Sequence, residues 1–121
     1  ENVSDVYFRS GLRVDFDNRL VTVDSREIHL TKNEFRILSL LCRYSGRVLT
    51  YDFIIKSVWG AQAAESNGIL RVNIANLRKK IEQDSGNPLY LFTENGVGYK
   101  IAESAVAPFT PENIKIPELL G

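Results

Sequence analysis

The chain has 121 residues, with 15 basic and 15 acidic side chains, one histidine, one cysteine and a formal charge of zero. This length can bury one hydrophobic core but hardly two. A single cysteine excludes a disulfide framework and a zinc-finger ligand set, and no segment has the apolar length of a membrane span. We therefore expect one small domain that binds no membrane and works in the reducing cytoplasm. The chain begins at Glu1 and has no methionine, so we also expect it to be part of a longer protein.

The N-terminal third alternates apolar and polar residues, as antiparallel strands do. Turn residues at Asp17-Asn18 and Asp24-Ser25 separate three such segments. The apolar positions of the three segments are Leu12, Val14 and Phe16, then Val21 and Val23, then Ile28 and Leu30. The pattern predicts a small antiparallel meander.

Four polar or reactive side chains in this half of the chain are candidates for chemistry. Asp15 and Asp17 are two residues apart on an expected strand, and paired carboxylates can serve catalysis or bind a metal. No further ligand accompanies them, and His29 alternates toward solvent. Cys42 lies in an apolar run, which favours a buried, inert thiol over a redox sensor. We expect no catalytic site, no metal, no cofactor and no enzymatic activity.

Two helices are expected next. Thr31 as N-cap and Glu34 three residues later form a capping box for a helix that runs to Ser45. A second helix is expected to begin at Thr50 and to stop at Gly60. The small-residue connector that follows is either a protein-contact loop or a passive linker.

A cationic amphipathic helix then begins near Asn67. Its apolar residues recur at the i, i+4, i+7, i+11 spacing of one buried face, and they are Leu70, Ile74, Leu77 and Ile81. The remaining faces carry Arg71, Val72, Asn73, Ala75, Asn76, Arg78, Lys79 and Lys80. Amides can bond base edges and cations can hold phosphates. Taken without its neighbours, such a face is more often a solvated helix surface.

A hairpin follows this helix after a short connector. Residues 89–94 and 99–102 are predicted strands, and Asn95-Gly96-Val97-Gly98 supplies turn residues that tolerate positive φ. A basic helix followed by such a hairpin predicts an α+β winged helix-turn-helix, with an N-terminal antiparallel meander, three helices and a C-terminal β-hairpin wing. This arrangement favours DNA binding. The alternative is a winged helix that binds only proteins.

The elements in this order resemble the effector domain of OmpR/PhoB-type response regulators. The resemblance covers Val6 to Ala102 and is carried by residues 30–38, Val58-Trp59-Gly60, residues 77–82 and Gly96-Val97-Gly98-Tyr99. Leu70-Arg71, Glu82-Gln83-Asp84 and Thr93-Glu94 are further similar to the KdpE-like branch, which governs potassium uptake. We therefore expect residues 1–102 to be the effector domain and residues 103–121 to be a tail of unassigned role.

The resemblance implies a two-component transcription factor whose receiver domain lies upstream, absent from this chain, and is phosphorylated by a sensor histidine kinase. Such a protein forms a homodimer on double-stranded DNA with tandem direct repeats and contacts RNA polymerase. Groove contacts would fall to Val72, Asn73, Asn76 and Lys79, and phosphate contacts to Arg71, Arg78, Lys80 and Thr93. The polymerase contact would fall to Trp59, Gly60, Ala61, Gln62, Ala63, Ala64, Glu65 and Ser66.

The wing departs from the family pattern at one position. Many members carry an arginine before the wing Gly-x-Gly, where it suits a narrow minor groove. This chain has Asn95 there, so we expect a weaker minor-groove contact. Lys100 keeps one cation near the hairpin, and an ordinary solvated lysine is an equal alternative for it.

Overall fold

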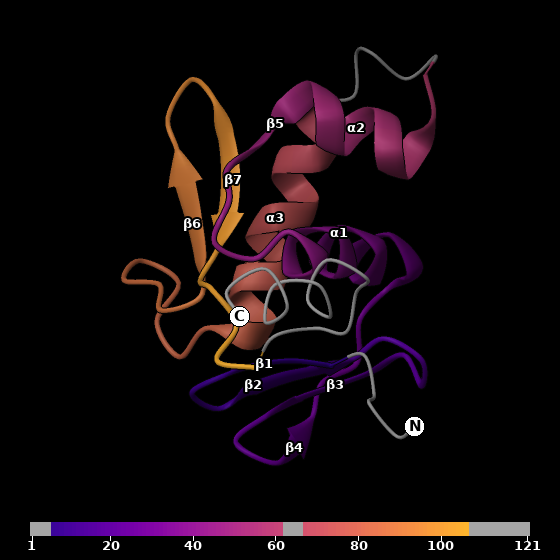
Figure 1. The fold of residues 1–121 in the computed structure, drawn as a ribbon. Helices are drawn as coiled ribbons and strands as arrows, with labels where there is room; N and C mark the ends of the chain where they lie inside the picture. The colour runs from indigo at the N-terminus through magenta and orange to yellow at the C-terminus, as the bar shows by residue number, and fades with distance from the viewer. Residues whose placement is uncertain (1–5, 62–66, 107–121) are drawn as a thin grey trace, which may run out of the picture.

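The computed structural model describes residues 6–61 and 67–106, which form an N-terminal sheet, three helices and a C-terminal hairpin (Figure 1). In chain order the elements are β1 Val6–Arg9, β2 Leu12–Asp15, β3 Leu20–Val23, β4 Arg26–Glu27, α1 Lys32–Arg43, β5 Leu49–Thr50, α2 Tyr51–Trp59, α3 Asn67–Ile81, β6 Leu91–Glu94 and β7 Gly98–Ile101. The predicted α+β class is confirmed. No helix in the described ranges is long and apolar enough to cross a membrane.

The N-terminal sheet is antiparallel, with strand order β1-β2-β3-β4. The meander is confirmed, but its limits differ from the prediction. Strand β1 was not predicted, because its adjacent residues Val6 and Tyr7 are both buried and the alternating pattern is missing. The last strand is only Arg26–Glu27, and Ile28 lies just beyond it, partly buried against the core. Positive φ angles at Asp24 and Ser25 (50° and 69°) make the tight turn that the sequence predicted there.

The capping motifs set both early helices as predicted. The Thr31 hydroxyl accepts a hydrogen bond from the Glu34 N–H, and the Glu34 carboxylate accepts one from the Thr31 N–H, at 3.1 and 3.0 Å. Helix α1 ends at Arg43, two residues before the predicted Ser45. The chain then turns at Gly46, whose N–H donates to the Ile101 carbonyl. Helix α2 begins after its N-cap Thr50 and ends before Gly60, as predicted.

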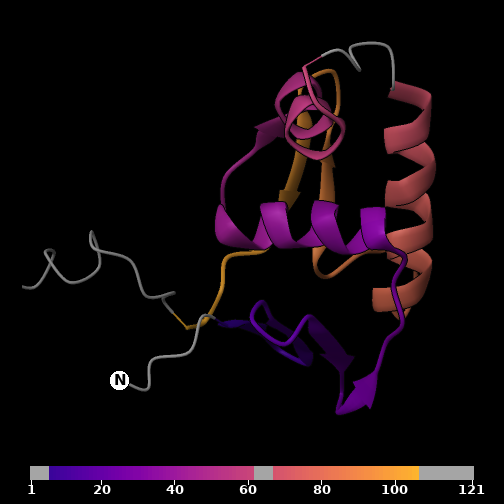
Figure 2. The ribbon, with the colours of Figure 1, turned by 90° about the vertical axis from the view of Figure 1, so that its right-hand side faces the viewer.

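Figure 2 shows α1 lying across the middle of the molecule, with the N-terminal sheet below it and α2 and the hairpin above. Helix α3 stands along one side of this stack and reaches from α2 to the sheet (Figure 2). All four residues of its predicted apolar stripe are 1% exposed or less. The stripe therefore fixes α3 against the core and leaves its opposite face outward.

An ion pair between a buried carboxylate and a partly exposed lysine ties α1 to α3. The Glu34 carboxylate, whose side chain is only 3% exposed, lies 2.6 Å from the Lys80 ammonium. The same Glu34 oxygen also accepts the Thr31 N–H, so its charge is matched by two donors. A buried carboxylate needs such partners, because an unpaired charge in the interior is strongly unfavourable.

A second buried carboxylate holds the connector between α3 and the hairpin. Glu82, which is 7% exposed, accepts the backbone N–H groups of Leu89, Tyr90 and Leu91 at 2.7, 3.0 and 2.8 Å. Three charge-assisted bonds to consecutive backbone groups fix where β6 begins. The position of the hairpin relative to α3 therefore depends on Glu82.

The hairpin is joined to the helices through a short strand that the sequence did not predict. Strand β5 pairs with β7, with Leu49 opposite Tyr99 and Thr50 opposite Gly98. A Cβ at Gly98 would lie 1.7 Å from the Leu49 carbonyl oxygen. Of the four predicted turn residues, only Gly96 has a positive φ, at 79°. Residues 95–97 form the turn as predicted, and Gly96 is the one among them that uses a positive φ. Gly98 belongs to β7, where glycine is required by close backbone approach.

The first residues of the predicted tail continue along the edge of β1. The Ala105 N–H donates to the Phe8 carbonyl at 2.7 Å, and the Tyr7 hydroxyl donates to the Ala102 carbonyl at 2.7 Å. The Ser104 hydroxyl accepts the Phe8 N–H at 3.2 Å. Residues 103–106 are thus attached to the domain, while the rest of the tail lies outside the described residues.

The candidate reactive groups lie where the sequence placed them. Cys42 is fully buried, and desolvation raises the pKa of its thiol, which disfavours the reactive thiolate. His29 is exposed. The Asp15 carboxylate accepts hydrogen bonds from the Asn18 side chain and backbone, and these lower its pKa. No three His, Cys, Asp or Glu side chains gather as a metal site in the described chain.

Replacing Gly98 with alanine should lower the free energy of unfolding by about 1–3 kcal/mol, because the new methyl group would overlap the Leu49 carbonyl. Urea denaturation measures this difference. Gly68→Ala is the matched control, since a Cβ at that helical position meets nothing within 4 Å. Equal stability of the two variants would show that the β5–β7 contact can yield without cost.

Lys80→Met should lower the free energy of unfolding by about 1–3 kcal/mol, because it leaves the buried Glu34 carboxylate with the Thr31 N–H alone. Lys79→Met removes the same charge from an exposed position and should change stability by no more than about 0.5 kcal/mol. Urea denaturation of the two variants tests the assignment. A similar effect at both positions would mean that the ion pair contributes nothing specific.

Candidate nucleic-acid interface

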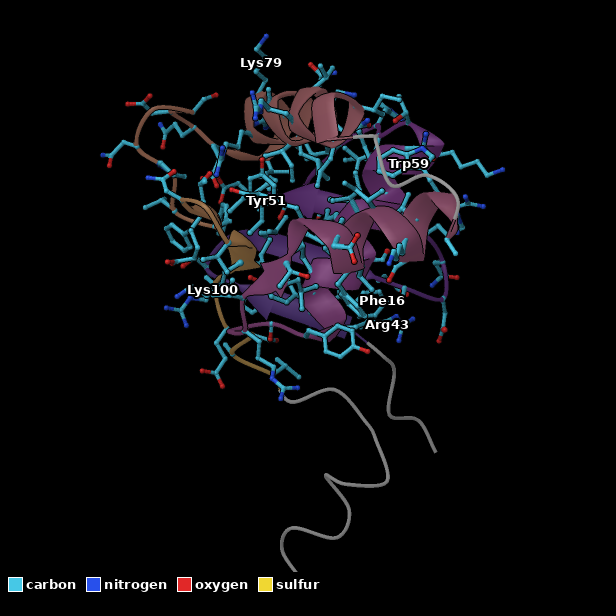
Figure 3. All side chains as sticks on the ribbon, turned by 90° about the horizontal axis from the view of Figure 1, so that it is seen from above. Phe16, Arg43, Tyr51, Trp59, Lys79 and Lys100 are labelled. Carbon is cyan, nitrogen blue, oxygen red and sulfur yellow. The ribbon has the colours of Figure 1, made fainter. Side chains whose placement is uncertain are left out.

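Of the residues that the helical pattern placed opposite the buried stripe, Val72, Ala75 and Lys79 are exposed, while Asn76 is partly buried. Val72 is 60% exposed, and Arg71 is exposed as well. Figure 3 shows Lys79 projecting from α3 away from the rest of the molecule. A helix of this width, held by one face and bare on the other, can enter the major groove of DNA.

The two predicted base-reading amides on α3 are in different states. The Asn73 side chain donates to the Ile69 carbonyl at 2.9 Å, one turn earlier in the same helix. This bond occupies one amide donor, so bidentate contact with a base would require the side chain to rotate. Within the described residues the Asn76 amide makes no hydrogen bond. Asn76 is therefore the better-prepared base reader of the two.

Arg78 bridges α3 and the hairpin. Its Nε donates to the Leu91 carbonyl at 3.1 Å, and its Nη2 donates to the Thr93 hydroxyl at 2.6 Å. Its guanidinium carbon lies 5.9 Å from the centre of the Tyr99 ring. Three of its contacts are thus internal, and Arg78 positions the hairpin in addition to any phosphate contact.

A groove of about 510 Å³ lies between α3, the start of α2 and the hairpin. Its lining residues are Tyr51, Leu70, Arg71, Arg78, Thr93, Asn95, Gly96 and Tyr99. The groove brings together four predicted site residues from α3 and the hairpin, which are separated in sequence by up to 24 positions (95 − 71). The α3–hairpin pairing that the sequence predicted is therefore present as one continuous surface.

Two tyrosines form the inner wall of this groove. The Tyr51 and Tyr99 rings meet edge to face, with centroids 5.4 Å apart, and the Tyr51 N–H donates to the Val97 carbonyl at 3.2 Å. Tyr99 is 6% exposed, in agreement with a packing role, and burial raises the pKa of its phenol. Sequence reasoning missed Tyr51, because only the β5–β7 pairing brings the start of α2 beside the hairpin.

Two predicted cations lie outside this surface or are already engaged. Lys80 pairs with Glu34, so its charge is largely used inside the fold, which weakens the case for a phosphate contact. Lys100 is half-buried on β7 opposite Phe92 and does not line the groove. Figure 3 shows Lys100 on the hairpin side of the molecule, well away from Lys79.

The predicted polymerase loop is described only at its start. Trp59 is partly buried against the core, Gly60 caps α2 with a φ of 102°, and Ala61 is exposed. Gln62, Ala63, Ala64, Glu65 and Ser66 lie outside the described residues. The role of this loop stays a prediction.

Comparisons with known proteins identify the kind of domain that carries this surface. The family model described as "Transcriptional regulatory protein, C terminal" matches residues 25–101. KdpE, the KDP operon transcriptional regulatory protein of Escherichia coli K12, is 40% identical over 91 residues, which are 75% of this chain and 40% of KdpE. Identity to one such protein does not exclude other branches, so the KdpE-like assignment stays a prediction.

Solved structures agree with the family match. The response regulator DrrB of Thermotoga maritima, an OmpR/PhoB homologue, is similar with a TM-score of 0.75 and 32% identity, over 81% of this chain and 44% of DrrB. The DNA-binding domain of Klebsiella pneumoniae RstA, solved in complex with the RstA box, has a TM-score of 0.73 and 25% identity, over 80% of this chain and 96% of that one. The chain belongs to the family of C-terminal domains of transcriptional regulatory proteins, the DNA-binding effector domains of OmpR/PhoB-type response regulators.

Proposed function

We propose that this chain binds double-stranded DNA sequence-specifically through α3 and the hairpin, as the output domain of a two-component response regulator. The observation that carries the proposal is the groove in which Arg71 and Arg78 of α3 lie beside Thr93 and Asn95 of the hairpin, next to the exposed face of α3. Helix α3 fits the major groove, and the hairpin reaches the adjacent DNA backbone.

The residues of this surface divide between base reading and positioning. Asn76 offers an amide that can bond a base edge, and Val72 and Lys79 lie beside it on the outward helix face. Asn73 can also contact a base once its side chain rotates away from the Ile69 carbonyl. Arg71 is exposed at the groove and suits a phosphate. Arg78 and Thr93 are hydrogen-bonded to each other. As a pair they position the hairpin against the duplex and contact the phosphate backbone of the DNA.

The hairpin makes the weaker contact. Asn95 and Gly96 stand at its tip and line the groove, and neither carries charge. The narrow minor groove attracts cations because its potential is negative. Asn95 can donate a hydrogen bond there without the electrostatic gain of an arginine, so α3 carries most of the affinity. Lys100 does not line the groove, and its positive charge attracts the DNA from a greater distance.

The whole protein would extend well beyond this chain, which covers 40% of KdpE. In the proposed protein, residues 1–102 are the effector domain, residues 103–121 are the tail, and a receiver domain upstream accepts a phosphoryl group from a sensor histidine kinase. Phosphorylation leads to a homodimer on tandem direct repeats in the cytoplasm. The loop from Trp59 to Ser66 contacts RNA polymerase. The RstA domain solved with the RstA box supports the DNA-binding part of this proposal.

Selection of random duplexes by the full chain tests the proposal directly. Enrichment of a short motif, followed by tighter binding to that motif than to a scrambled duplex over a series of salt concentrations, is the expected result. No enrichment, together with weak association that does not depend on salt, would favour a winged helix that binds only proteins.

Asn76→Ala should reduce the preference for the selected site over a single-base variant by about 1–3 kcal/mol, while leaving the affinity for scrambled DNA unchanged. Arg71→Gln should weaken binding to all duplexes and reduce the salt slope by about one. Fluorescence anisotropy with both duplexes measures these effects. The division of roles would be wrong if Asn76→Ala lowered both affinities equally.

Arg78→Lys keeps the positive charge but loses the two hydrogen bonds to Leu91 and Thr93. We expect about tenfold weaker DNA binding with an unchanged salt slope, because the hairpin loses its fixed position while the charge remains. Arg71→Lys is the matched control and should retain affinity. Wild-type affinity of Arg78→Lys would show that Arg78 serves only as a phosphate-binding charge.

A further inference from the structure

A second hollow, of about 340 Å³, lies between the turn after β2, helix α1 and the end of α2. We call it the arginine pocket, after Arg19, Arg36 and Arg43, which line it together with Phe16, Phe35 and Ser39. Figure 3 shows Phe16 and Arg43 on the side of the molecule opposite Lys79. The pocket is therefore separate from the DNA surface and stays accessible when α3 lies on a duplex.

Two guanidinium groups in this pocket lie over aromatic rings. The Arg19 guanidinium carbon lies 4.3 Å from the centre of the Phe35 ring, and that of Arg43 lies 4.3 Å from the centre of the Phe16 ring. Stacking uses the face of a guanidinium and leaves the N–H groups at its edge able to donate. The Phe35 ring thus holds the Arg19 guanidinium at the pocket, where its N–H groups can donate to a carboxylate.

The positive charge of this pocket is not balanced by the residues that line it. None of the lining residues is acidic, and within the described chain neither Arg19 nor Arg36 forms an ion pair. Clustered like charges repel one another, so an anion bound among them is stabilised.

An unpaired hydroxyl borders the same hollow. Ser39 Oγ is buried and has no hydrogen-bond partner within the described residues. Buried polar atoms without partners are uncommon in folded proteins and call for an explanation. Rotation of the Ser39 side chain would bring this hydroxyl to an anion in the pocket, where it could donate.

We propose that the arginine pocket binds carboxylate side chains on an acidic segment of a partner protein. The volume is near the lower end of the range for small-molecule sites (about 300–1,000 Å³), which suits one or two side chains. The Phe16 and Phe35 rings contact the aliphatic part of an Asp or Glu, and the guanidinium edges bind its carboxylate. Ser57 and Val58 also line the pocket, so its occupant lies beside the end of α2. This proposal stands independently of DNA binding.

Titration of the ¹⁵N-labelled full chain with hexaglutamate peptide tests the proposal, with the arginine Nε–H signals observed by NMR. We expect saturable shifts of the Arg19 and Arg36 signals, with smaller shifts for Arg71. Hexaglutamine should cause none, and free succinate should bind at least about tenfold more weakly, because it offers only one pair of carboxylates. Succinate binding as tight as that of the peptide would overturn the assignment to a protein segment.

Two charge-matched variants locate the binding. Arg36→Gln should weaken hexaglutamate binding about tenfold, while Arg26→Gln removes an exposed cation on β4 and should leave it unchanged. The two variants should bind duplex DNA with equal affinity. Equal loss of peptide binding in both variants, or shifts confined to α3, would show general charge attraction and refute the pocket.

Discussion

The attachment of α3 is the constraint on which the rest of this structure depends. A recognition helix must present one face to DNA without moving relative to the hairpin that accompanies it. Its apolar stripe supplies most of the burial, and three polar residues near its C-terminal end supply direction. Lys80 reaches α1 through Glu34, Arg78 reaches β6, and Glu82 accepts three N–H groups from the chain that leads into β6. Apolar packing is non-directional, so these bonds determine how helix and hairpin are aligned.

The same arrangement explains why three consecutive cations differ in role. Arg78, Lys79 and Lys80 look equivalent in the sequence, yet successive residues on a helix are rotated by about 100° and meet different surroundings. Arg78 faces the hairpin, Lys80 faces the buried Glu34, and Lys79 projects outward (Figure 3). Within the described residues, Lys80 alone of the three forms an ion pair, while Arg78 keeps its charge but is bound to neutral groups of the hairpin. The number of basic residues on a recognition helix therefore overstates the charge that it can bring to DNA.

Patterns local in sequence predicted most of the fold. The capping box at Thr31, the N-cap at Thr50 and the stripe on α3 depend on residues a few positions apart, so they could be read directly. Contacts between distant segments could not. Glu34 and Lys80 are 46 residues apart, and Gly98 meets Leu49 only because β5 pairs with β7. The candidate site follows the same division, since its α3 residues were predicted while Tyr51, which reaches the groove through that pairing, was missed.

A formal charge of zero conceals two positive regions that face opposite ways. At physiological salt, exposed charges are screened beyond about 8 Å, so each surface responds mainly to its own neighbourhood. Around α3 the cations stand beside the partly exposed amides of Asn73 and Asn76, and that combination suits DNA, an extended polyanion whose base edges can be bonded. In the arginine pocket two guanidiniums lie over phenyl rings in a small hollow, and that combination suits a small planar anion. Because the two surfaces differ in shape and lie on opposite sides, one domain can hold DNA and an acidic partner at the same time.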